Sequence, residues 1–88
     1  AKPFLTRFQS GEQNYTVKDK QAALGSLEKE FQNGRITRLD GLSAYFSDWW
    51  FNARPSNTEP FLRVNIEADT KELLESQRAK IESIVSSH

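Results

Sequence analysis

Apolar and polar residues alternate through the second half of the chain, with the period of a β-strand that has one buried face. Over 61–68 every second residue is apolar, and these residues are Leu62, Val64, Ile66 and Ala68. The same pattern predicts further strands over 14–17, 35–39, 42–46 and 49–54. Asp40-Gly41 and Ser47-Asp48 are typical of the turns between strands, since glycine adopts positive φ without strain. The pattern therefore predicts an antiparallel sheet with one apolar face.

Two other segments have the helical period. Asp19 is the predicted N-cap of a helix that runs to about Gln32, with an apolar stripe made by Leu24, Leu27 and Phe31. Asp69 begins a capping-box pattern for a second helix, whose stripe contains Leu73, Leu74, Ile81, Ile84 and Val85. The predicted order is strand, helix, four strands, helix. These elements pack most simply as an α+β two-layer sandwich, with both helices on one face of the antiparallel sheet.

The composition narrows the class of protein. The 88 residues suffice for one domain. Lys and Arg total 12 and Asp and Glu total 12, so the net charge of zero creates no general attraction for nucleic acid or anionic membranes. The absence of cysteine excludes disulfides and thiolate metal sites, and no apolar stretch reaches the length of a membrane span. We expect a cytoplasmic protein and, since no initiating Met is present, a piece of a longer chain.

The segment 54–60 is the strongest candidate for a binding site. It reads RPSNTEP and lies between two predicted strands. A phosphate dianion needs several convergent donors, and a guanidinium, two hydroxyls and the backbone N–H groups of a tight turn could supply them. A polar hairpin without a ligand is the plainer interpretation of the same seven residues.

The residues that flank this loop carry a resemblance to a known family. The run WWFNARPSNTEPFLRVNIEAD over 49–69, with SGEQN at 10–14 and LDG at 39–41, resembles the C-terminal domain of the α-D-phosphohexomutases. It is similar to the phosphomannomutase/phosphoglucomutase branch, and the resemblance extends over roughly residues 10–86. It implies a TATA-binding-protein-like fold, with an interdomain linker over 1–12 and a phosphate-binding domain over 13–88.

The resemblance also implies a function for the longer protein. Phosphohexomutases are four-domain isomerases of carbohydrate metabolism that interconvert hexose 1-phosphate and hexose 6-phosphate, here most simply those of mannose and glucose. The family's phosphoserine, magnesium and sugar-recognising loops have no match in this sequence. We therefore expect no catalytic residue, metal ligand or cofactor in this chain, magnesium bound by another domain of the parent enzyme, and an inactive fragment. The expected partners are the hexose phosphate and the other three domains.

By the same resemblance, the loop would bind the non-reacting phosphate of the substrate and help to close the cleft. Arg54 would bind two phosphate oxygens, and Ser56 and Thr58 would donate hydroxyl and backbone hydrogen bonds. Asn57 would contribute its amide and adopt the left-handed conformation of a tight anion-binding turn. Glu59 is expected to brace the loop, and the prolines at both ends would reduce its freedom.

Two alternatives from other classes remain. An open antiparallel sheet backed by two helices, with one of the adjacent Trp49, Trp50 and Phe51 exposed for base stacking, is also typical of modules that bind single-stranded nucleic acid, although no basic stripe supports this. A non-catalytic interaction domain would instead use a sheet edge or the apolar residues of the N-terminal tether, 1–13. Arg63 is interpreted as a surface charge and a lesser candidate for attracting phosphate.

Overall fold

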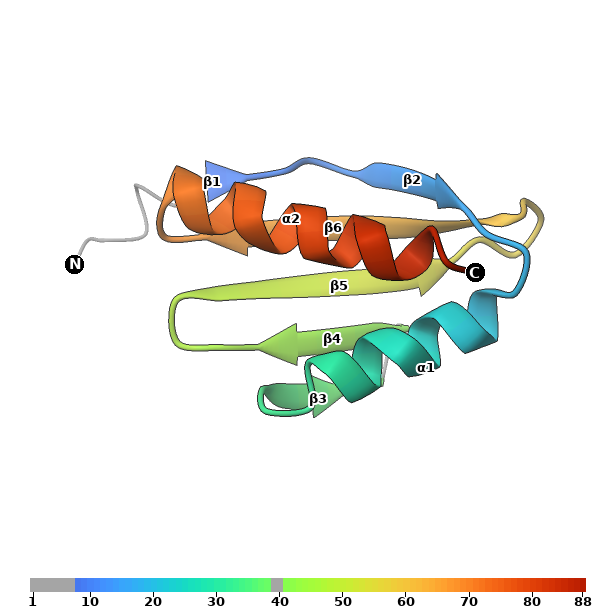
Figure 1. Ribbon diagram of the computed structural model, residues 1–88, viewed down its shortest axis with the longest axis horizontal. Coiled ribbons are helices and arrows are strands. Elements are labelled where there is room, and N and C mark those ends of the chain that lie inside the picture. Colours follow the sequence, from blue (N-terminus) through green and yellow to red (C-terminus); the bar gives the residue numbers. More distant parts are fainter. Residues whose placement is uncertain (1–7, 39–40) are drawn as a thin grey trace.

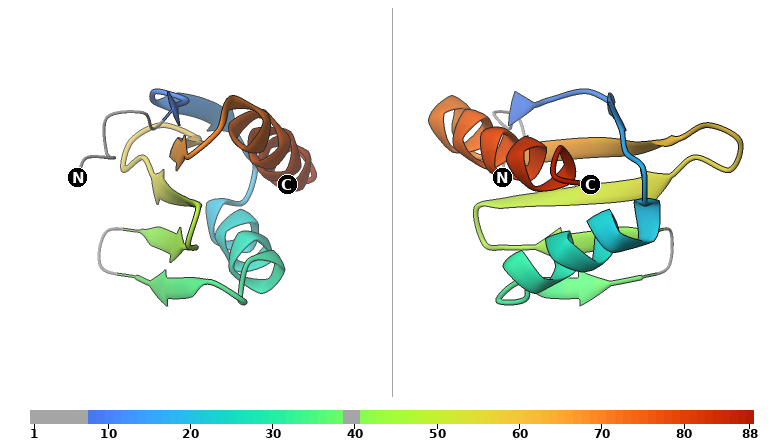
Figure 2. Two further views of the ribbon diagram at one scale, coloured as in Figure 1. Left: turned by 90° about the vertical axis from the view of Figure 1, so that its left-hand side faces the viewer. Right: turned by 45° about the vertical axis from the view of Figure 1, so that its right-hand side comes forward.

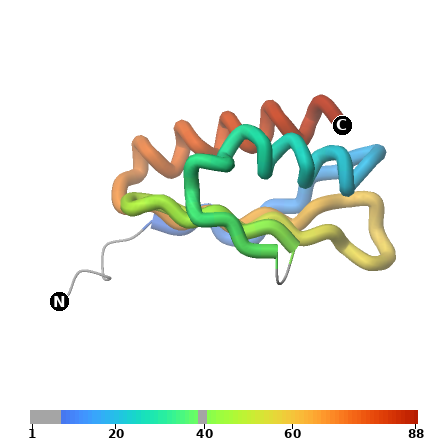
Figure 3. The backbone as a smooth tube through the Cα atoms, turned by 90° about the horizontal axis from the view of Figure 1, so that it is seen from below, coloured from blue at the N-terminus to red at the C-terminus, as the bar shows by residue number. Residues whose placement is uncertain are grey.

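Two helices and an antiparallel sheet form two layers. The computed structural model describes residues 8–38 and 41–88. Within them the elements are β1 (Phe8–Gln9), β2 (Gln13–Thr16), α1 (Lys20–Glu30), β3 (Arg35–Thr37), β4 (Leu42–Tyr45), β5 (Trp49–Pro55), β6 (Phe61–Ala68) and α2 (Lys71–Val85). Both helices cover the same face of the sheet, and the opposite face is open (Figures 2 and 3). The predicted α+β two-layer sandwich is confirmed.

The sheet is built around the long hairpin of β5 and β6. The strand order is β1-β6-β5-β4-β3, with β2 also pairing with β6, and every pairing is antiparallel. The β5–β6 register runs from Trp49 opposite Ala68 to Pro55 opposite Leu62. The loop after Pro55 therefore continues the two central strands of the fold.

The first two strands are one edge strand interrupted by a bulge. Gln9 lies opposite Glu67 and Gln13 lies opposite Val64, so three residues of the edge face two residues of β6. Gly11 lies in this bulge with a φ of 73°, a conformation that glycine adopts readily. The strand β1 was not predicted, because the polar Ser10-Gly11 step breaks the alternation. The tether residues 1–7 and the turn residues 39–40 lie outside the described part of the chain.

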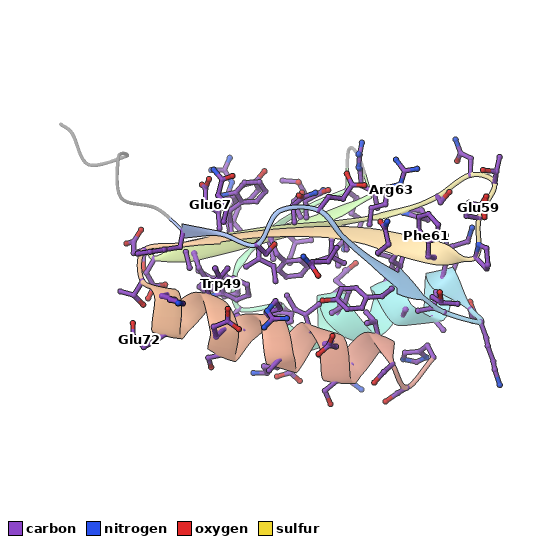
Figure 4. All side chains as sticks on the ribbon, turned by 90° about the horizontal axis from the view of Figure 1, so that it is seen from above. Trp49, Glu59, Phe61, Arg63, Glu67 and Glu72 are labelled. Atoms are coloured by element: carbon purple, nitrogen blue, oxygen red, sulfur yellow. The ribbon has the colours of Figure 1, made fainter. Side chains whose placement is uncertain are left out.

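The core follows the alternation of the sequence. The four predicted inward residues of β6 are at most 2% exposed, and the helices bury Leu27, Ile81 and Val85 against the sheet. In β5, Trp49 and Phe51 face the helices. The centroid of the Trp49 ring lies 5.4 Å from that of Phe31 and 5.7 Å from that of Phe51. Figure 4 shows Trp49 on the helix side of the sheet and Arg63 and Glu67 on the open side.

The helix caps agree with the prediction in one case and differ in the other. The carboxylate of Asp19 accepts a hydrogen bond from the Ala22 N–H at 3.0 Å, which confirms the first cap. The second cap is Thr70, whose hydroxyl accepts from the Leu73 N–H at 3.1 Å, so the prediction of Asp69 as cap was wrong. The Asp69 N–H donates to the Asp48 carbonyl, which keeps this residue in the turn at the end of the sheet.

Replacing Thr70 with alanine is expected to lower the free energy of unfolding by about 1 kcal/mol, since one N–H at the start of α2 loses its acceptor. Urea denaturation followed by circular dichroism measures this loss. Ser76→Ala, an exposed change inside the same helix, is the control and is expected to leave stability unchanged or slightly raised. Equal losses in the two variants would contradict Thr70 as the cap.

Candidate functional site

The loop between β5 and β6 leaves two adjacent backbone donors uncommitted. It lies at the same end of the molecule as the start of α1 (Figure 1). The Ser56 N–H donates to the Phe61 carbonyl at 3.0 Å, and the Glu59 N–H donates to Ser56 Oγ at 3.2 Å. Within the described part of the chain, the N–H groups of Asn57 and Thr58 have no acceptor. Exposed N–H groups on consecutive residues are suited to an anion.

The carbonyl groups at the two ends of this loop are held from the helix layer. Lys20, the first residue of α1, donates from its ammonium group to the Ser56 carbonyl at 2.6 Å and to the Glu59 carbonyl at 3.2 Å. The Val17 N–H donates to the Pro60 carbonyl at 3.0 Å. The loop is therefore anchored on one side, toward the segment that connects β2 to α1.

Positive charge gathers beside the loop on the open face. Arg54 is exposed, and among residues 8–38 and 41–88 no carboxylate forms an ion pair with it. Its cross-strand neighbour is Arg63, and like charges at opposed positions repel each other. Arg63 is partly balanced by Glu12, whose carboxylate lies 4.0 Å from Arg63 Nε. An anion bound at this point would relieve the repulsion.

A shallow hollow of about 510 Å³ extends from Arg54 across the open face. Its far end carries Tyr45 stacked on Trp50, with ring centroids 5.6 Å apart. The Trp50 indole N–H donates to the Glu67 carboxylate at 2.9 Å, and the Gln9 side-chain amide donates to the other oxygen of the same carboxylate at 2.9 Å. Of the predicted site residues, Arg54 lines this hollow.

A comparison with known families decides the class of protein. The family domain described as phosphoglucomutase/phosphomannomutase, C-terminal domain, matches residues 12–84. The chain belongs to this family. As a phosphohexomutase C-terminal domain it is similar to members from archaea and bacteria.

Three relatives illustrate that similarity. A phosphomannomutase of Methanocaldococcus jannaschii is 39% identical over 77 residues, which cover 88% of this chain and 17% of the relative. Phosphohexose mutases of Xanthomonas campestris are 39% identical over 79 residues, covering 86% of this chain and 18% of the relative. A protein of Pyrococcus horikoshii named probable phosphoglucosamine mutase is 41% identical over 61 residues, covering 69% and 14%. The phosphohexomutase domain thus spans less than a fifth of the length of these relatives.

The predicted site residues in this loop of the phosphohexomutase domain differ in their exposure to solvent. Asn57 and Thr58 are exposed, whereas Ser56 is buried and braces the loop through Glu59. Positive φ angles occur, in the described residues, at Gly11 and Gly41. The prediction of a left-handed Asn57 was therefore wrong, because a five-residue connection braced by a serine hydroxyl reverses the chain with ordinary backbone angles.

Two residues that shape this loop of the phosphohexomutase domain were not predicted from the sequence. Lys20 reads as an ordinary lysine in a first helical turn, 36 positions from the carbonyl that it binds. Gly41 has a φ of 84°, and a Cβ atom there would lie 2.5 Å from the Ala53 carbonyl oxygen and 2.9 Å from the Arg54 Cα. The sequence did signal a turn at Gly41, but it gave no sign that the turn packs against Arg54.

Other features of the described chain lie apart from the loop. Burial raises the pKa of the Tyr15 hydroxyl, and a hydrogen bond from Arg38 lowers the pKa of the Glu28 carboxyl. In the described ranges, no three His, Asp or Glu side chains gather as a metal centre requires. No helix in that part of the chain has the length and apolar character needed to cross a membrane.

Proposed function

We propose that the loop 54–58 binds the phosphate group of a hexose phosphate, as the fourth domain of a phosphomannomutase/phosphoglucomutase that interconverts hexose 1- and 6-phosphates. One observation carries the proposal: the two uncommitted N–H groups, those of Asn57 and Thr58, lie three and four residues after Arg54, which has no carboxylate partner among the described residues. A cation and two adjacent backbone donors in one short loop are complementary to a phosphate dianion.

Each residue has a distinct part in this proposal. Arg54 would form two parallel charge-assisted hydrogen bonds, each contributing about 1.5–3 kcal/mol where water is excluded. Asn57 and Thr58 would donate their backbone N–H groups, and their side chains would reach the remaining oxygens. Ser56 Oγ accepts from Glu59 and keeps its own proton for donation to the phosphate. Arg63 would add attraction from the neighbouring strand.

These residues bind and orient a substrate without entering the chemical step. In the longer protein, the loop would hold the phosphate that is not being transferred, and closing of this domain on the cleft would exclude water. The phosphoserine and the magnesium ion of the parent enzyme would lie in other domains. The isolated chain is therefore expected to be inactive and to bind hexose phosphates weakly, with a Kd on the order of millimolar (about −4 kcal/mol).

The stacked Tyr45 and Trp50 on the open face favour a second candidate, the binding of single-stranded nucleic acid. The carboxylate of Glu67 beside Trp50 and the net charge of zero oppose it, because a nucleic-acid backbone is attracted by a basic surface.

A titration of the ¹⁵N-labelled chain, followed by amide NMR shifts, tests the proposal. Mannose 1-phosphate and mannose 6-phosphate are both expected to shift the amides of Arg54, Ser56, Asn57 and Thr58, and unphosphorylated mannose is expected to leave them unchanged. An oligothymidylate provides a further arm. Shifts centred on Trp50 with the oligonucleotide, and none at the loop with the sugar phosphates, would overturn the proposal in favour of the second candidate.

A further inference from the structure

One ammonium group binds two carbonyl groups that flank the uncommitted donors of the loop. Lys20 Nζ lies 2.6 Å from the Ser56 carbonyl oxygen and 3.2 Å from that of Glu59. Among the described residues, no other side-chain cation donates to a carbonyl of this loop. The side chain of Lys20 thereby joins the first turn of α1 to the connection between the two central strands.

The contact with Ser56 determines where the next N–H group points. A trans peptide unit is planar, and its C=O and N–H bonds point in opposite directions. No cis peptide bond occurs in the described residues. The Ser56 carbonyl and the Asn57 N–H belong to one such unit. When Lys20 holds the carbonyl toward α1, the Asn57 N–H must point away from α1.

The same contact strengthens that donor. A cation hydrogen-bonded to a carbonyl oxygen polarises the whole peptide unit, so that the N–H at its other side becomes a better donor. The same ammonium also binds the Glu59 carbonyl, so it links the far end of the loop to the near end. The N–H groups of Asn57 and Thr58 lie, along the chain, between the two carbonyl groups that Lys20 binds.

The position of Lys20 in its helix is otherwise unfavourable. The first turn of a helix carries a partial positive charge, which disfavours a lysine there. The N-cap carboxylate of Asp19 offsets part of this charge, and within the first turn itself α1 has no acidic residue. The two carbonyl contacts give Lys20 a further favourable interaction at this position.

We infer that Lys20 is a positioning residue that aims the Asn57 N–H at the bound phosphate. The inference rests on the proposed function of the loop. Lys20 does not touch the ligand in this arrangement. It acts through the peptide unit between Ser56 and Asn57, and its removal would let this unit rotate.

Titration of the full 88-residue chain with inorganic phosphate, followed at the Asn57 amide, tests this role. Lys20→Met is expected to weaken phosphate binding about tenfold, and Lys20→Arg is expected to recover most of the affinity by restoring a charged donor. The matched control is Lys29→Met, which removes the same charge from an exposed lysine of the same helix. This control is expected to change the affinity less than about twofold. Lys20→Gln, which keeps a neutral donor, serves as a second variant if Lys20→Met folds poorly.

Repeating the titrations at high ionic strength separates two effects of Lys20 on affinity: the orientation of the Asn57 N–H and the long-range attraction of its charge for phosphate. Salt screens the long-range attraction but has little effect on the orientation of a hydrogen-bond donor. A loss in Lys20→Met that persists at high salt, relative to wild type under the same conditions, supports the inference. Equal affinities of Lys20→Met and Lys29→Met, or a loss that disappears at high salt, would overturn it.

The outcome for wild type distinguishes this inference from the proposed function. If wild type binds phosphate at the loop and Lys20→Met binds equally well, the role of Lys20 fails while the proposed function stands. If wild type shows no response to phosphate, the proposed function fails, and the inference fails with it.

Discussion

Arg54→Ala is expected to weaken phosphate binding by about 10- to 100-fold, which corresponds to the loss of about one charge-assisted hydrogen bond. Arg54 is exposed beside the loop, and no described carboxylate competes for its guanidinium. Its cross-strand neighbour on β6 is another arginine, Arg63. Arg54→Lys is expected to give an intermediate affinity, because an ammonium group keeps the charge but cannot form two parallel bonds to one phosphate.

Phosphate titration of Arg54→Ala by amide NMR measures this effect, and a thermal melt shows whether the fold persists. The melting temperature is expected to stay the same or to rise slightly, because the change removes the repulsion with Arg63. Arg35→Ala is the matched control, an exposed arginine of β3 opposite Tyr45, and is expected to leave the affinity almost unchanged. Wild-type affinity in Arg54→Ala would exclude this residue from the site.

Phe51→Ala is expected to lower the free energy of unfolding by about 3–5 kcal/mol, through lost burial and the cavity that remains. Phe51 is fully buried in the central strand β5, with its ring centroid 5.1 Å from that of Phe31. A domain of this length has a total stability of about 4–13 kcal/mol at the usual value per residue. The variant is therefore expected to be partly or largely unfolded at room temperature.

Urea denaturation followed by tryptophan fluorescence measures the loss in Phe51→Ala. Phe8→Ala makes the same chemical change at a residue that is 43% exposed on the edge of the sheet, and it is expected to cost less than about 1 kcal/mol. Similar losses in the two variants would contradict the placement of the core on the helix side of β5.

The layers of the fold could be predicted because burial imposes a period on the sequence. The alternation in β6 and the stripes of α1 and α2 each report on a single face of one element, so neighbouring residues along the chain suffice to detect them. The strand β1 could not be found in this way. It is held by pairing with β6 and has two residues on the far side of a bulge, too few to establish a period.

The residue types of the candidate site could be predicted from the sequence, but the contacts that hold the loop could not. The donors of the loop 54–58 are visible as residue types, and the loop lies within the segment that matches a known family domain. The brace by Ser56 Oγ and the contact with Lys20 depend on how the chain returns to itself across the fold, for which a single sequence contains no local signal. The shift of the helix cap from Asp69 to Thr70 has the same origin, since the backbone of Asp69 is bound to Asp48 in the neighbouring turn.

The two edges of the sheet are short or interrupted. One edge is divided by the bulge at Gly11, and the other is β3, which has three residues. An unbroken edge strand offers a row of free backbone donors and acceptors on which a second polypeptide can assemble. Because neither edge presents such a row within residues 8–38 and 41–88, addition of a strand from a second copy to this part of the sheet is disfavoured.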